Sequence, residues 1–172
     1  DVCDRDLLRE IFADRVDAVI HCAAETHVDR SIDEPRDFVR TNVDGTLALL
    51  EASRRHGVDR FIQVSTDEVY GSIPPNESAT ESAPLRPSSP YAASKAGGDL
   101  LALSFFTTFG LPVVVSRCSN NFGPYQFPEK VIPLFATNAL QDLPLPLYGS
   151  GENRRDWLYV DDHCAALVAL LK

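Results

Sequence analysis

Short apolar runs rich in valine and isoleucine alternate along this chain with longer segments of helical pattern, and this alternation strongly constrains the fold. The runs at 17–22, 60–65 and 112–117 have the length and β-branched content of buried strands. Helical patterns lie near 6–15, 35–56 and 90–109. Strands that alternate with helices predict an α/β fold, in which helices cover a parallel sheet through right-handed crossovers.

The rest of the chain predicts further elements and one long loop. We expect a helix near 129–141, short strands near 145–148 and 156–160, and a helix from 161 to the end. A segment rich in proline, serine and glutamate spans 72–88. Because structureless loops of that length are uncommon inside compact domains, we interpret this one as an active-site flap rather than a linker.

The composition limits the class of protein. At 172 residues with 44% hydrophobic residues, the chain is long enough for one domain with a sizeable core. The net charge of −9 and the pI near 4.8 argue against a nucleic-acid-binding surface, so local basic groups must hold any phosphate. No apolar run approaches transmembrane length, and no signal peptide is visible.

The cysteines and histidines predict neither disulfides nor a metal site. The four cysteines, at positions 3, 22, 118 and 164, show no C-x-x-C pairing. Cys22 and Cys118 lie in or just after apolar strands, so we expect buried free thiols and a reduced, cytoplasmic protein. The four histidines, at 21, 27, 56 and 163, lack the spacing of metal ligands, and we expect no metal.

Two adjacent carboxylates follow the central apolar run. Ser65 and Thr66 end that run and are followed by Asp67 and Glu68, at the strand end where open α/β sheets place their ligands. An Asp-Glu pair elsewhere is usually a solvated part of a loop. Here the strand end, the neighbouring hydroxyl and a Tyr/Lys pair farther along favour chemistry, since carboxylates in different environments can divide acid and base roles.

The Tyr/Lys pair is Tyr91 and Lys95, four residues apart near the start of the helical pattern at 90–109. Ser89 and Pro90 predict the helix start, and residues i and i+4 share one helix face. A nearby ammonium favours the phenolate, so we expect a lowered Tyr91 pKa that suits proton abstraction from an alcohol. Alone, the spacing often occurs by chance between two solvated side chains.

Taken together, these stretches resemble the nucleotide-sugar 4,6-dehydratases, a family of the extended short-chain dehydrogenase/reductase superfamily. The resembling segments follow the family's order and cover essentially the whole chain, at 21–32, 65–71, 89–95, 118–130 and 155–160. Tyr-x-x-x-Lys marks only the superfamily, whereas Thr-Asp-Glu after the strand marks dehydratases. The stretches C-S-N-N-x-G-P-Y and R-D-W-L resemble the branch that acts on dTDP-glucose rather than UDP-glucose.

The resemblance implies a Rossmann-like doubly wound parallel sheet that is incomplete in this chain. No glycine among the nine forms the G-x-x-G-x-x-G turn that seats a dinucleotide, so we expect an internal fragment that begins inside a Rossmann domain. Residues 1–117 would be the C-terminal part of the NAD-binding domain and would carry the catalytic residues. Residues 118–172 would begin the sugar-nucleotide-binding region, mixed with late Rossmann elements.

The resemblance also implies a reaction sequence in which NAD is the cofactor and dTDP-glucose the substrate. Tyr91, assisted by Lys95, would take the proton from the C4 hydroxyl of the sugar while NAD+ accepts hydride from C4. Thr66 would hydrogen-bond the same oxygen. Glu68 would remove the C5 proton, Asp67 would protonate the departing C6 hydroxyl, and hydride would return to C6.

Binding residues are implied by the same matches. Those for NAD are Asp1, Val2, Cys22, Ala23, Ala24, Glu25, Thr26, Thr41, Tyr91, Lys95 and Asn121. Those for the sugar nucleotide are Thr26, Thr66, Asn120, Lys130, Val131, Pro146, Leu147, Tyr148 and Arg155. Arg155 has the best chemical support, because a guanidinium fork matches phosphate geometry.

Other functions stay open at the level of sequence. The protein could be a UDP-glucose 4,6-dehydratase or another nucleotide-sugar short-chain enzyme. It could also be a non-catalytic dinucleotide-binding regulator on the same fold, although the intact set of Asp67, Glu68, Tyr91 and Lys95 argues against that. Members of the superfamily commonly dimerise through two long helices, so we expect a homodimer in which the helices near 35–56 and 90–109 pair.

Overall fold

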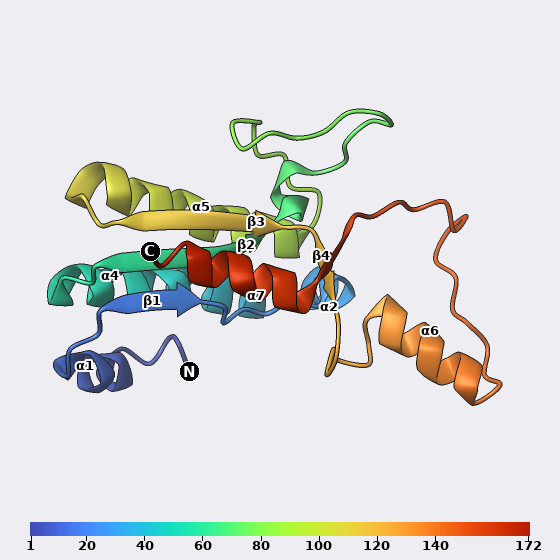
Figure 1. Ribbon diagram of the computed structural model, residues 1–172, viewed down its shortest axis with the longest axis horizontal. Coiled ribbons are helices and arrows are strands. Elements are labelled where there is room, and N and C mark those ends of the chain that lie inside the picture. The colour runs from blue at the N-terminus through green and yellow to red at the C-terminus, as the bar shows by residue number, and fades with distance from the viewer. The chain divides into compact units, whose positions relative to one another are not determined.

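Strand β2 (Arg60–Thr66) lies between β1 (Ala18–His21) and β3 (Val113–Cys118), and all three strands are parallel. Their arrows point the same way in Figure 1, so their carboxyl ends meet at one edge of the sheet. Phe61 and Ile62 of β2 are fully buried, as the unbroken apolar run predicts for a central strand. The α/β class with a parallel sheet is thereby confirmed.

The computed structural model describes residues 1–172 and separates into two compact units. The first unit contains Asp1–Cys118 and Leu167–Lys172, and the second contains Ser119–Ala166. In the second unit, β4 (Asn120–Phe122) pairs in parallel with β5 (Trp157–Tyr159). Two helices complete its regular structure, α6 (Val131–Leu140) and α7 (Val160–Ala169), the latter running on into the first unit's residues.

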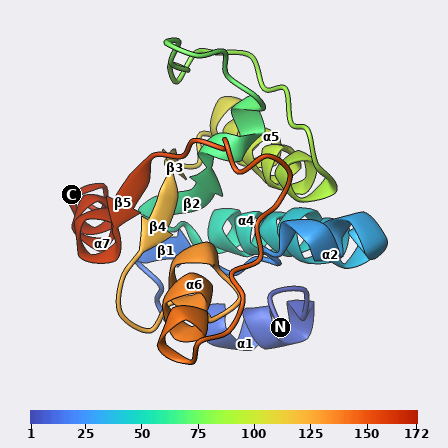
Figure 2. The same cartoon turned by 90° about the vertical axis from the view of Figure 1, so that its right-hand side faces the viewer.

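Helices cover one face of the three-stranded sheet. Figures 1 and 2 show α4 and α5 side by side on that face, with α1 beside α4. Their bounds are α1 Arg5–Ala13, α4 Thr46–His56 and α5 Pro90–Phe109. The core beneath them is formed by Leu8, Phe12, Leu49, Leu50, Val58, Phe61, Ala102, Phe105 and Leu111.

Helix ends follow local rules that the sequence displays. Ser89 caps α5 by accepting a hydrogen bond from the Ala92 backbone amide at 3.1 Å, and Pro90 occupies the first turn. Gly110 ends α5 and Gly57 ends α4, each in the left-handed conformation that glycine adopts without strain (φ 70° and 68°). The start and stop of α5 were therefore predictable from local residues.

The segment expected as one helix at 35–56 is helical in three successive parts. These are α3 (Pro35–Val39), the π-helical turn η1 (Arg40–Gly45) and α4. Three further short elements were not predicted: α2 (Val28–Asp33), the 3₁₀ turn η2 (Asp67–Tyr70) and β4. No helix in residues 1–172 is both long enough and apolar enough to cross a membrane.

One expected strand and one expected buried cysteine are wrong. Residues 145–148 form no strand, because Pro144 and Pro146 have no backbone N–H to donate to a ladder. Cys22 is exposed rather than buried, since β1 ends at His21 and the chain leaves the sheet there. Cys118 is half-buried, and the four cysteines form no disulfide.

We expect adjacent glycines of α5 to differ sharply in their tolerance of a methyl group. A Cβ at Gly98 would lie 2.9 Å from the Asn42 carbonyl oxygen, whereas a Cβ at Gly97 would meet only a Val43 methyl at 3.3 Å. Gly98→Ala should therefore lower the free energy of unfolding by about 1–3 kcal/mol through overpacking. Gly97→Ala, the matched control, should be neutral or should stabilise by up to about 1 kcal/mol through helix propensity. Denaturant unfolding of both variants tests this, and equal effects would contradict it.

Candidate active site

The acid pair lies in a capped turn at the carboxyl end of β2. Thr66 ends the strand, and its Oγ1 accepts a hydrogen bond from the Glu68 backbone amide at 3.2 Å. The same hydroxyl donates to Asp67 Oδ1 at 3.3 Å. Both carboxylate side chains are partly buried. A local cap therefore turns the chain so that a hydroxyl and two acids lie together at the strand end.

Tyr91 lies beside this turn, on the first turn of α5. Its side chain is buried, and the Tyr91 phenol makes a hydrogen bond with the Thr66 hydroxyl and lies near the charge of Glu68. Its backbone amide donates to Ser31 Oγ at 3.1 Å, and its ring contacts Phe38 edge to face at 6.4 Å between centroids. The structure thus brings Tyr91 next to Thr66 and Glu68, which lie well before it in the sequence.

The pKa of Tyr91 is raised, contrary to the expectation from the Tyr/Lys spacing. Burial is the largest cause, because it disfavours the phenolate, and the negative charge of Glu68 acts in the same direction. The hydrogen bond with Thr66 opposes the shift. The Tyr91 phenol is therefore held in its protonated form.

Lys95 points into the sheet. Its ammonium donates a hydrogen bond to the Val64 carbonyl oxygen at 2.7 Å, and the residue is buried. Burial lowers the pKa of Lys95, and the nearby carboxylate of Asp99 opposes that shift. One helical face thus carries Tyr91, Lys95 and Asp99 at successive i+4 positions, all buried against β2 and β3.

Asn42, which sequence reasoning missed, links the loop after β1 to α5. Its side-chain oxygen accepts from the Glu25 backbone amide at 2.9 Å, and its amide donates to the Glu25 carbonyl at 3.0 Å. The same amide reaches Ser94 Oγ at 2.9 Å, and Ser94 donates to the Tyr91 carbonyl at 2.7 Å. Asn42 lies four residues after the buried Phe38, on the face of the helical pattern that is expected to be buried, and a polar residue at that position was the signal that could have found it.

The residues expected to bind the cofactor border the same sheet edge. Cys22, Ala23 and Thr26 are exposed in the loop after β1, and Glu25 in that loop is held by Asn42. Asp1 and Val2 lie against η1, which carries Thr41. There the Asp1 carboxylate accepts a hydrogen bond from Arg40 at 2.7 Å, and Val2 packs against Gly45.

The loop after β1 has room for a planar ring, because the side chains of Cys22, Ala23 and Thr26 at this strand end are small and exposed. These residues therefore fit a dinucleotide.

The buried His21 lies directly before that loop. Its Nε2 is 3.0 Å from Thr46 Oγ1, and the Thr46 hydroxyl donates to the Asn42 carbonyl at 2.7 Å. His21 Nε2 must therefore carry the proton that it shares with Thr46. Burial and the charge of Lys95 lower the pKa of His21 to about 4, so the ring is neutral at neutral pH.

The remaining predicted residues belong to the second unit. Asn120 and Asn121 lie on β4, and the Asn121 carbonyl accepts from Gln126 at 2.9 Å. Lys130 precedes α6 and contacts Glu129 at 3.4 Å. Val131 lines an apolar cavity of about 340 Å³ together with Phe122, Ile132, Phe135 and Trp157. Pro146, Leu147, Tyr148 and Arg155 are exposed in the irregular segment before β5.

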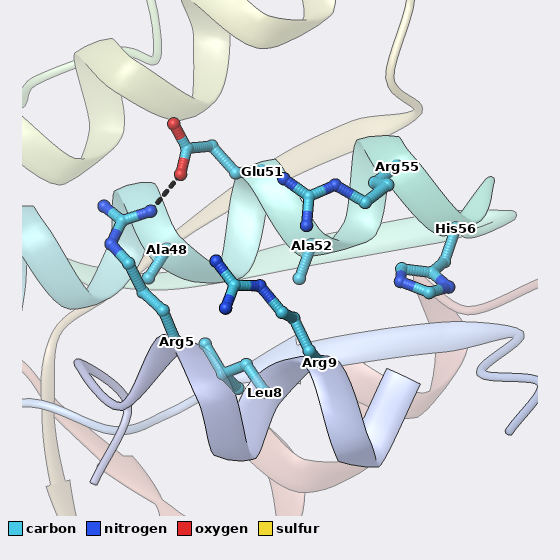
Figure 3. A pocket seen from close by; sticks show the side chains of 8 residues that line it. All are labelled: Arg5, Leu8, Arg9, Ala48, Glu51, Ala52, Arg55 and His56. Atoms are coloured by element: carbon cyan, nitrogen blue, oxygen red, sulfur yellow. Dashed lines mark hydrogen bonds and ion pairs between the residues drawn. The ribbon is translucent and has the colours of Figure 1, made fainter. Parts of the chain in front are cut away.

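A second cavity lies between α1 and α4, away from these residues. Figure 3 shows three arginines around it, with Arg5 paired to Glu51. Its volume of about 30 Å³ has room for no more than a few water molecules. It is therefore too small for a nucleotide or a sugar, and none of the predicted site residues lines it.

Comparison with known proteins gives consistent matches over the whole chain. The model of the NAD dependent epimerase/dehydratase family matches residues 1–172. A dTDP-glucose 4,6-dehydratase of Streptomyces niveus is 57% identical over 171 residues, covering 99% of this chain and 50% of that protein. The chain thus spans about half the length of the curated relatives it matches.

Solved structures agree with these matches. A dTDP-glucose 4,6-dehydratase from Streptomyces venezuelae, crystallised with NAD bound, superposes with a TM-score of 0.95 at 55% identity, over 99% of this chain and 52% of that chain. A UDP-glucuronic acid 4-epimerase from Bacillus cereus, in complex with UDP-glucuronic acid and NAD, reaches a TM-score of 0.93 at 32% identity, over 100% and 54%. The fold is therefore shared by enzymes of different activities.

We expect His21 to make stability depend on pH. The unfolded chain binds a proton at this ring near pH 6.5, whereas the folded protein binds it only near pH 4. The contribution of His21 to the free energy of unfolding is thus fully present above about pH 6.5 and falls by roughly 3 kcal/mol toward pH 4. His21→Gln should flatten the pH profile of denaturant unfolding in this window. The exposed His56→Gln is the control, and an unchanged profile for His21→Gln would contradict the assignment.

Proposed function

The chain belongs to the NAD dependent epimerase/dehydratase family, and from this premise we propose that the protein is a nucleotide-sugar 4,6-dehydratase. It converts dTDP-glucose to dTDP-4-keto-6-deoxyglucose and water. Several similar curated relatives carry that name, among them the Streptomyces antibioticus protein at 61% identity over 95% of this chain. Because the chain spans about half of such relatives, the activity is proposed for the full-length protein.

One observation carries the proposal. Thr66, Asp67 and Glu68 share a capped turn at the end of β2, and the phenol of Tyr91 lies against that turn. An alcohol oxidation needs a group that takes a hydroxyl proton, and an elimination of water needs a second base and an acid. The described residues supply one side chain for each of these tasks.

Tyr91 takes the proton of the sugar C4 hydroxyl, and Thr66 hydrogen-bonds the same oxygen. The contact of Thr66 with the phenol supports this pairing, since both groups then face one substrate oxygen. Lys95 has its ammonium anchored on the Val64 carbonyl and contributes positive charge beneath the site. Since burial raises the Tyr91 pKa, loss of its proton depends on the charges that surround the bound substrate.

The two carboxyl groups divide the elimination. Glu68 removes the C5 proton, which the ketone at C4 makes acidic, and Asp67 gives a proton to the departing C6 hydroxyl. The Asp67 carboxylate accepts a hydrogen bond from the Thr66 hydroxyl, whereas Glu68 contacts the same hydroxyl through its backbone amide. Their unequal environments support unequal roles.

Bound NAD would supply the acceptor for the hydride from C4 and, once reduced, the donor for its return to C6. The residues proposed to hold it are Asp1, Val2, Cys22, Ala23, Ala24, Glu25, Thr26, Thr41, Tyr91, Lys95 and Asn121. Those proposed for the sugar nucleotide are Thr26, Thr66, Asn120, Lys130, Val131, Pro146, Leu147, Tyr148 and Arg155. Residues 1–117 form the NAD-binding part, and 118–172 begin the sugar-nucleotide region of a cytoplasmic enzyme.

Replacing Glu68 by Gln should separate the two half-reactions. The variant keeps Tyr91 and Lys95, so the full-length protein should still form reduced nicotinamide when dTDP-glucose is added. Its formation of 4-keto-6-deoxy product should fall by about 10²–10⁴-fold, as expected for loss of a general base. Single-turnover absorbance and product analysis measure both signals.

Tyr91→Phe is the matched variant, because it should abolish both signals. Product formation by Glu68→Gln at the wild-type rate would show that the assignment of this carboxylate is wrong. Parallel assays of the wild type with UDP-glucose separate the two dehydratase activities. Failure of the wild type on both substrates would favour a non-catalytic dinucleotide-binding protein.

We also propose that the full-length enzyme is a homodimer that pairs the helical segment α3–η1–α4 with α5. Leu100, Leu103 and Phe106 are 59%, 42% and 56% exposed on α5, which is unusual for a monomer surface. Their spacing of three residues places them along one side of the helix. Such an apolar stripe is typical of a helix that packs against a second copy.

Light scattering of the full-length protein should therefore give twice the mass of one chain at micromolar concentration. Leu103→Glu should shift the population toward monomer, because the dimer would bury an unpaired charge. Leu140→Glu is the control, since that side chain is 87% exposed at the end of α6. A wild-type monomer would contradict the proposal.

A further inference from the structure

A buried ion pair joins α5 to β3 behind the proposed active site. Arg117 Nε donates to Asp99 Oδ2 at 2.8 Å, and the two side chains are 13% and 0% exposed. Burial raises the pKa of Asp99, and the bond with Arg117 opposes that shift. A charge pair this deeply buried is costly unless its geometry is kept, so it holds its elements at a defined separation.

Arg117 also holds the turn that carries the acid pair. Its Nη1 donates to the Tyr70 hydroxyl at 2.9 Å, and its guanidinium carbon lies 5.2 Å from the centre of the Tyr70 ring. Tyr70 is the last residue of η2, the turn that begins with Asp67 and Glu68. The same Nη1 reaches the Glu81 carbonyl at 3.4 Å, so the loop at 72–88 is tied to the same group.

The turn η2 is thus restrained at both ends. Thr66 caps its start, and Arg117 binds the side chain at its end. Between them Val69 is fully buried, and its carbonyl accepts from the Arg86 backbone amide at 2.9 Å. Arg117 supplies the polar contact that joins the end of this turn to the helix bearing Tyr91 and Lys95.

We infer that Arg117, acting through Tyr70, is a positioning residue for the elimination of water. It sets the acid pair Asp67/Glu68 relative to Tyr91, because one guanidinium binds both Asp99 of α5 and Tyr70 of η2. This inference rests on the proposed function, since it assigns Glu68 and Asp67 to that step. Nothing in it requires Arg117 or Tyr70 to touch the substrate.

The two bonds of Arg117 predict different consequences. The bond to Asp99 affects the oxidation at C4, because the charge of Asp99 raises the pKa of Lys95 and Lys95 assists that step. The bond to Tyr70 affects only the position of the acid pair, since Tyr70 ends the turn that carries Asp67 and Glu68. Removing the Tyr70 hydroxyl should thus impair elimination while oxidation continues, which a general loss of stability would not do.

The test is Tyr70→Phe in the full-length enzyme with dTDP-glucose. Formation of reduced nicotinamide should stay within about twofold of wild type, whereas release of 4-keto-6-deoxy product should slow by about 10- to 100-fold, as small misplacements of catalytic groups do. Reduced nicotinamide should therefore accumulate during turnover. Tyr125→Phe is the control, since that side chain is fully exposed in the second unit.

Arg117→Lys provides a second variant that keeps a positive charge beside Asp99. An ammonium lacks the planar fork needed to bind Asp99 and Tyr70 together, so it should reproduce the selective defect of Tyr70→Phe. Wild-type rates for both steps in Tyr70→Phe would overturn the inference, as would an equal slowing of both steps. Absence of product with the wild-type enzyme would instead overturn the proposed function.

Discussion

Helix α5 is anchored to the sheet by two buried charged side chains, and the arrangement of the first unit depends on this anchoring. Lys95 binds the Val64 carbonyl of β2, and Asp99 binds Arg117 of β3. A buried charge without a partner costs several kcal/mol, so few positions of the helix satisfy both groups. Tyr91 lies one turn before Lys95 and is therefore placed against the end of β2.

A neighbouring face of α5 is held by close packing and by uncharged polar groups. Gly98 lets the helix approach the Asn42 carbonyl more closely than any residue with a Cβ could. Asn42 then bonds both Ser94 of the helix and Glu25 of the loop after β1. Since these buried amides are satisfied, the network adds rigidity rather than strain. The loop proposed to face the cofactor is thus coupled to the helix that carries Tyr91.

Burial dominates the electrostatics of the site. Burial raises the Tyr91 pKa and lowers those of Lys95 and His21, which disfavours the charged form in each case. The simple expectation that an i+4 lysine lowers a tyrosine pKa considered one charge and omitted desolvation. In this protein desolvation is the largest contribution for all three groups.

Local sequence determined the elements and the chemistry that they carry. The apolar run ending at Thr66, the Ser89 cap and the Gly110 stop each act within a few residues, so they could be read directly. The same kind of reading failed at 145–148, where apolar content suggested a strand but proline removes the donors. Only the tertiary structure decided that Arg117 binds both Asp99 and Tyr70. The same holds for the hydrogen bonds of Asn42 with Glu25 and Ser94. It also holds for the bond from Lys95 to the Val64 carbonyl. Those contacts join separate elements, and they depend on how the elements pack rather than on any local pattern.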